Sequence, residues 1–208
     1  MTTKRSLIRR ATAVAAAATT ALVLAACGGN GDETGSAGSG RNTASPAASA
    51  PAQQGDHNAA DVAFAQGMIP HHRQAIEMAD LAATRAESAD ARKLAGEIKK
   101  AQDPEIKTLS GWLTSWGEQV PAGGGGHDGH DMSGMMSGEE MKQLESSSGK
   151  AFDTAFLQLM VKHHEGAVAM AKTEQSDGKY QPAKDMAGAI IASQSAEIAR
   201  MNTLLGKS

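Results

Sequence analysis

The residues of this sequence best suited to chemistry are two pairs of adjacent histidines, His71-His72 and His163-His164. Imidazole nitrogens bind copper, zinc, nickel and iron. One methionine precedes each pair, three residues before its first histidine: Met68 before His71, and Met160 before His163. Thioether sulfur selects soft ions such as Cu(I). The combination indicates a transition-metal site, with copper, as Cu(I) or Cu(II), preferred to zinc or iron.

Two glutamates and two further methionines extend this set. Glu105 and Glu197 each fall in the middle of the apolar stripe of a second periodic segment. A carboxylate there is costly unless it meets a cation, a hydrogen-bond donor or a metal, and the histidines are the obvious partners. Met78 and Met170 follow the histidine pairs. Two alternatives stay open: each Glu–His pair is a buried polar contact that fixes helix register, and each methionine fills the core.

A Gly-, His- and Met-rich tract lies between the two histidine pairs, inside a crossover over residues 121–149. It offers no periodic apolar positions, so its side chains are expected to have no core to fill. Flexible tracts of this composition suit metal capture, and the alternative is a solvated linker. Its candidate ligands are His127, His130, Met132, Met135 and Met136.

The chain contains an internal duplication. The stretch Asp61–Ala79 recurs as Asp153–Ala171, a shift of 92 residues. At the same shift Gln102 falls on Gln194 and Glu105 falls on Glu197, with no gap. The repeated unit is therefore a pair of elements, repeat one over 59–120 and repeat two over 150–208.

Both elements of each repeat are predicted to be helices. Apolar and histidine positions recur at spacings of three and four residues, which is the period of one helical face. Two hairpins joined by a long crossover predict an all-α four-helix bundle. Pro70 and Pro104 fall inside predicted helices and should kink them or mark a boundary.

The N-terminus is predicted to direct export. Basic residues precede an Ala-rich apolar run that ends in Leu24-Ala25-Ala26-Cys27, which fits a lipoprotein signal peptide over residues 1–26. Cys27 would then carry lipid and tether the chain to the outer face of the membrane. Residues 27–58 are rich in Gly, Ser, Ala and Pro and are predicted to be a disordered linker. The alternative for the N-terminus is an uncleaved anchor helix.

Cysteine content and charge exclude several classes. Cys27 is the single cysteine, so neither an internal disulfide nor a thiolate ligand is available to the body. The chain has 20 basic and 23 acidic residues, and its first 26 residues include four of the basic and none of the acidic ones, which leaves a formal charge of −7. An acidic exported protein is not expected to bind nucleic acid.

These segments resemble a known family. The sequence M-I-P-H-H-R-Q-A-I-E-M-A, its counterpart around His163-His164 and the Q-x-x-E-I-x-x-x-x-x-W-L-x-x-W tail are similar to the bacterial "domain of unknown function 305" family. The resemblance covers nearly all of 61–205. It implies an exported, ferritin-like protein, in some members tied to copper. Its histidines match His71, His72, His163 and His164, and its methionines match Met68, Met78, Met160 and Met170. Leu204-Leu205 replace Trp-Leu in the second tail, which bears on packing.

The predicted function is an extracytoplasmic, membrane-tethered protein that buffers, sequesters or delivers copper without turnover, with copper-handling envelope proteins as candidate partners. Glu-x-x-His, the motif of di-iron enzymes of this fold, is absent from the sequence, as are a serine nucleophile constellation and a phosphate loop. The alternatives are a ferritin-like metal oxidoreductase and a non-metal envelope interaction module.

Overall fold

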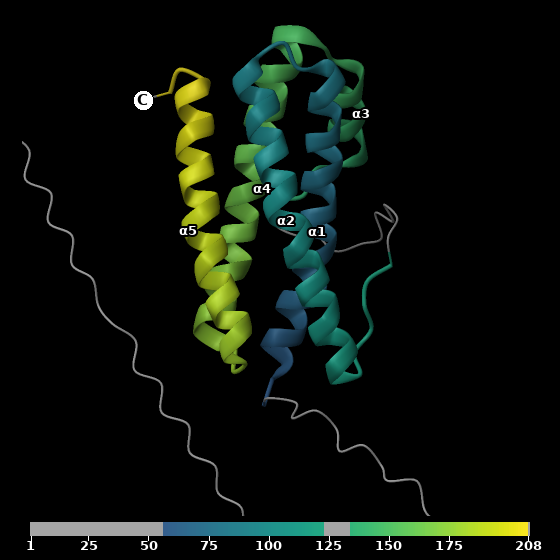
Figure 1. The fold of residues 1–208 in the computed structure, drawn as a ribbon, viewed down its shortest axis with the longest axis vertical. Helices are drawn as coiled ribbons and strands as arrows, with labels where there is room; N and C mark the ends of the chain where they lie inside the picture. Colours follow the sequence, from purple (N-terminus) through teal and green to yellow (C-terminus); the bar gives the residue numbers. More distant parts are fainter. Residues whose placement is uncertain (1–55, 123–133, 208) are drawn as a thin grey trace, which may run out of the picture. The chain divides into compact units, whose positions relative to one another are not determined.

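The computed structural model describes residues 56–122 and 134–207. This part of the chain folds into five helices: α1 (Ala59–Arg85), α2 (Ala89–Trp116), α3 (Gly138–Ser146), α4 (Gly149–Asp177) and α5 (Gln181–Leu204). The four long helices form the predicted bundle of two hairpins, α1 with α2 and α4 with α5 (Figure 1). None of the described helices is long and apolar enough to cross a membrane. The predicted signal peptide, Cys27 and most of the predicted linker lie outside the described residues.

Local sequence signals set the helix ends. Asn58 begins α1 through a capping box with Asp61, and Ser137 begins α3 through one with Glu140. Ser88 caps α2 by accepting a hydrogen bond from the backbone N–H of Ala91. Gly117 ends α2 in the left-handed conformation, with φ of 77°. Each cap satisfies backbone groups that a helix end leaves unpaired.

Two details of the fold differ from the sequence prediction. Helices α1 and α2 run without a break through Pro70 and Pro104, so of the two predicted outcomes there, a kink or a boundary, the boundary is excluded. The crossover contains a helix, α3, that the sequence analysis missed. It contacts both α1 and α4, and Figure 1 shows it beside α1 on the side of the bundle away from α5.

The central contact between the hairpins is made by α1 and α4. The aspartate that begins each duplicated stretch reinforces it by binding the other repeat's hairpin turn. Asp61 accepts hydrogen bonds from the backbone N–H groups of Lys179 and Tyr180, in the α4–α5 turn. Asp153 accepts them from Glu87 and Ser88, in the α1–α2 turn. The duplication is thus visible in space as reciprocal contacts.

Candidate metal centre

A buried polar layer crosses the middle of the bundle between two apolar clusters. On all four long helices its residues lie, in sequence, between the residues of one cluster and those of the other. On α1, for example, Ile69 belongs to one cluster and Ala75 to the other. On each long helix the buried apolar positions are therefore interrupted by buried polar residues, and these interruptions lie at the same height along the bundle. Its members are His71, His72, Gln74, Gln102, His163, His164 and Gln194.

Each hairpin contributes one histidine–glutamate contact to this layer. His72 Nε2 lies 2.6 Å from Glu105 Oε2, and His164 Nε2 lies 2.7 Å from Glu197 Oε2. The histidine side chains are fully buried, whereas the glutamates are 22% and 21% exposed. The predicted placement of these glutamates opposite the histidines is confirmed. Each glutamate orients its imidazole and also lies at the edge of solvent.

The other two histidines meet at the contact between the two repeats. The rings of His71 on α1 and His163 on α4 have centroids 3.7 Å apart at an interplanar angle of 44°, and both side chains are fully buried. Burial, followed by the nearby rings of His71, His164 and His72, holds the pKa of His163 well below its ordinary value. His163 is therefore neutral near pH 7, which is the form of imidazole that binds a metal.

The layer also contains buried atoms that the described part of the chain leaves without a hydrogen-bond partner. They include Nδ1 of His72 and of His164, and Oε1 of Gln102 and of Gln194. Leaving such atoms unpaired is costly unless a ligand or water meets them. Neutral imidazole nitrogens suit copper or zinc, so these residues fit a metal of that kind. Among the described residues, however, no three His, Cys, Asp or Glu side chains are grouped to hold one ion.

The predicted methionine ligands of the bundle are core residues. Met68 lies in one apolar cluster, Met78 and Met160 lie in the other, and all three are fully buried. Met170 is partly buried against the first cluster. Their positions agree with core filling and leave their role as ligands a prediction.

The crossover divides into a part that is described and a part that is not. Met136 is only 2% exposed and packs in the same cluster as Met78 and Met160, so the expectation that this tract has no core to fill is wrong there. Met135 is partly buried. The remaining candidate ligands of the tract, His127, His130 and Met132, lie outside the described residues.

Sequence reasoning missed a buried carboxyl pair at the start of α1. Glu174 is 1% exposed beside Asp61, and burial, followed by the neighbouring Asp61 carboxylate, raises its pKa from 4.5 to about 8. Burial of Asp61 is outweighed by hydrogen bonds from Asn58 and Tyr180, so its own pKa is lowered. A Cβ on Gly178 would collide with the Glu174 carboxyl. The sequence signal was the duplication itself, because Ala82 and Ala86 occupy the equivalent positions of repeat one.

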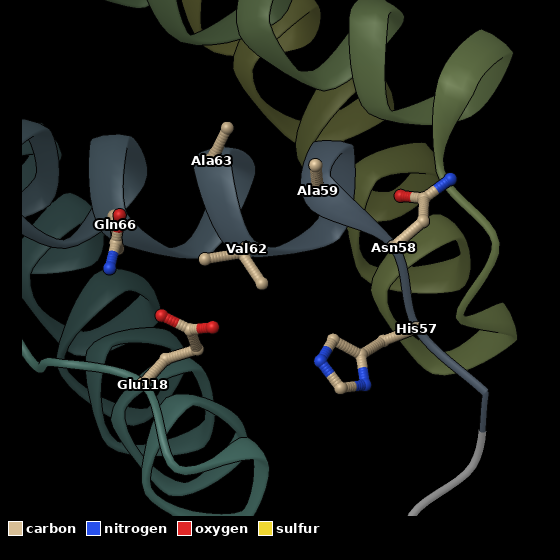
Figure 2. Close-up of a pocket in the computed structure, with 7 residues that line it drawn as sticks. All are labelled: His57, Asn58, Ala59, Val62, Ala63, Gln66 and Glu118. Carbon is tan, nitrogen blue, oxygen red and sulfur yellow. The ribbon is translucent and has the colours of Figure 1, made fainter.

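A surface groove lies apart from the layer, between the start of α1 and the end of α2 (Figure 2). His57 and Glu118 line it together with small and amide side chains of α1. The ring of His57 stacks on Trp116 with centroids 4.4 Å apart. No predicted metal ligand lines this groove, so the candidate centre is the buried layer.

The chain is similar in sequence and in structure to several known proteins. The family model "Domain of unknown function (DUF305)" matches residues 61–205. The structure is similar to that of a DUF305 protein from Streptomyces coelicolor, described as secreted (34% identity, TM-score 0.65, covering 71% of this chain and 93% of that one). It is also similar to CopM in its Cu(II)-bound form (36% identity, TM-score 0.61, 69% and 94% covered). A DUF305 fragment from Deinococcus radiodurans matches at 28% identity with a TM-score of 0.65, over 73% and 98% of the two chains. No protein of curated function matches.

Proposed function

The chain belongs to the DUF305 family, and on that premise we propose that it is an extracytoplasmic protein that binds copper in the histidine layer of its bundle. The observation that carries the proposal is the meeting of His71 and His163, one from each repeat, in a fully buried site that favours the neutral imidazole. Copper is the preferred ion because the buried donors are nitrogens, with thioethers in the adjoining clusters.

The relatives support the choice of metal. CopM has been solved in Cu(II)-bound, Cu(I)-bound and silver-bound forms. Silver(I) is a soft ion of the same charge as Cu(I), so the same kinds of ligand suit both. In this chain the residues available to hold copper are His71, His72, His163 and His164, with Glu105 and Glu197 orienting two of them.

The N-terminal segment determines where the domain would act. The signal peptide and Cys27 would place the domain outside the cytoplasm and tether it to the outer face of the membrane by lipid. There it would buffer, sequester or deliver copper without turnover. The secreted description of the Streptomyces coelicolor relative supports the extracytoplasmic location.

The proposal is tested by isolating the full chain, identifying its metal, and titrating it with Cu(I), Cu(II) and Zn(II) under competition. We expect copper to bind most tightly, and the variant His71→Ala with His163→Ala to lose that site. His57→Ala is the matched control, because His57 lies outside the layer. A folded chain with no affinity for copper would favour a non-metal envelope module. Consumption of dioxygen with Fe(II) would favour a metal oxidase.

The crossover is proposed to bind metal separately from the bundle. Deleting 123–133 removes His127, His130 and Met132 but keeps Met136 and its core contacts. We expect this deletion to lower the copper stoichiometry and to leave the tightest site. Loss of all binding would move the function to the crossover.

A further inference from the structure

One segment of the crossover is fixed between the two central helices. We call Gly134–Ser137 the strap. On the α1 side, the Gln74 side chain donates to the backbone carbonyl of Met136 (2.9 Å) and accepts from its N–H (2.7 Å). On the α4 side, Gly134 has φ of 86°, and a Cβ there would lie 2.7 Å from the Lys162 carbonyl oxygen and 2.8 Å from Gly166 Cα. The strap therefore bridges α1 and α4.

The strap lies one helical turn from the His71–His163 pair. Gln74 follows His71 by three residues, and Gly166 follows His163 by three, so each shares a helical face with its histidine. On α1, His72 projects to the opposite side of His71 from Gln74, toward Glu105 of α2. The strap thus lies on the side of the pair that faces away from α2, one turn along the helices from it, and α3 follows the strap in contact with α1 and α4.

The two residues that receive the strap occupy equivalent positions of the duplication. Gln74 and Gly166 are related by the 92-residue shift, within segments that otherwise match closely. The strap is one segment that crosses two helices related by the duplication, so it contacts equivalent positions on both of them. Because the strap has no symmetry of its own, the residues at these two positions must differ. Here one position supplies an amide that is 6% exposed and satisfies both backbone groups of Met136, and the other supplies no side chain.

We propose that the strap is a releasable cover over the His71–His163 pair, that Gln74 holds it closed, and that a metal ion reaches these histidines when it opens. The part about the metal rests on the proposed copper function. The part about access does not, because it concerns only exposure of two buried imidazoles. The strap is suited to opening because two side-chain hydrogen bonds and one buried side chain, that of Met136, hold it to the bundle, rather than a continuous helix.

The first test uses the full chain without metal. Hydrogen exchange is followed at the Met136 amide, and deuterium exchange at imidazole C2 is followed for His71 and His163 by mass spectrometry. Gln74→Leu keeps the side-chain volume and removes both hydrogen bonds, so exchange at all three sites should accelerate by about fivefold to thirtyfold. Gln66→Leu is the matched control, since it removes an amide contact of α1 to the Gln119 carbonyl outside the strap.

A second variant tests whether faster exchange comes from opening of the strap rather than from the leucine side chain itself. Gly134→Ala should displace the strap from α4 and reproduce the faster exchange. Gly117→Ala is its control, because Gly117 has a similar φ of 77° and a Cβ there would meet nothing within 4 Å. If Met136 exchanges faster but the imidazoles do not, the strap is not the cover. If neither variant speeds exchange at Met136, Gln74 does not hold the strap. Either result overturns the proposal.

The second test adds Cu(I) and measures association by stopped flow. Gln74→Leu should raise the association rate by a similar factor. An unchanged rate, despite exposed imidazoles, would mean that copper reaches the layer from the α2–α5 side, past Glu105 and Glu197, and would overturn the metal part of the proposal. If the wild-type chain binds no copper, the copper function fails while the exchange measurements still decide the role of the strap.

Discussion

The two repeats share the contacts that build the bundle and differ at positions where only one of them makes an additional contact. The histidines, the glutamates that contact them and the aspartates that bind the opposite turn are present in both repeats and make the same contacts in space. Among the positions that differ, two sets make contacts in one repeat only. Gln74 faces Gly166 where the strap crosses, and Ala82 with Ala86 stand where repeat two has Glu174 with Gly178. At these positions the difference marks a contact that only one repeat makes.

The reciprocal turn contacts should have the largest effect on stability. Asp61→Ala and Asp153→Ala each leave backbone N–H groups of the opposite turn without their charged acceptor. We expect each to lower the free energy of unfolding by about 2 to 4 kcal/mol in urea denaturation. Asp103→Ala, at an exposed position of α2, should change it by less than about 0.5 kcal/mol. A small effect of either buried aspartate would show that the repeats are not joined reciprocally.

Glu174 should make the stability of repeat two depend on pH. Its pKa is about 8 in the folded chain and near 4.5 when unfolded, so the folded state binds the extra proton between these values. Stability contributed by this proton is present at low pH and is lost as pH rises toward 8, by up to about 1.4 kcal/mol per pH unit. Asp61 acts in the opposite direction below pH 3.8, outside this window.

The variant Glu174→Gln removes this titration. Between about pH 5 and about pH 8, its urea-denaturation stability should rise relative to that of the wild type as pH increases. Glu145→Gln, at an exposed position of α3, is the control and should leave the pH dependence unchanged. A constant difference between Glu174→Gln and the wild type across this range would mean that Glu174 is ionised in the folded protein.

These residues show what the sequence could and could not predict. The bundle, the histidine layer and its glutamates could be predicted, because a helical period and a gapless repeat can both be read directly from the sequence. The strap leaves no such pattern, because its contacts run from Gln74 to the backbone of Met136 and between Gly134 and Gly166. Helix α3 leaves only a capping box, Ser137 with Glu140, in a segment of 9 residues. Apart from its mismatch with Ala82 of repeat one, Glu174 resembles any surface glutamate in sequence. Its burial depends on Asp61 and Gly178, which only the fold brings beside it.

The smallest expected effect concerns the outer helices of the two repeats. Glu97 on α2 and Arg200 on α5 form an ion pair, and both side chains are more than one-third exposed. Solvent screens such a pair, so Arg200→Ala should destabilise the protein by less than about 1 kcal/mol. Thermal denaturation at low and high salt would check this. A loss comparable to that of Asp61→Ala would mean that α2 and α5 hold the repeats together as firmly as α1 and α4.

The central claim is that both repeats supply histidines to one copper-binding layer, and copper-linked stability of the full chain tests it most directly. Urea denaturation is measured with and without copper at a hundredfold excess over Kd, where binding to the folded state adds about 2.7 kcal/mol. His71→Ala with His72→Ala, and separately His163→Ala with His164→Ala, should each abolish most of this increment while the metal-free helices still form. If one pair can be removed without loss of the increment, or if either variant unfolds without metal, the shared-layer account is contradicted.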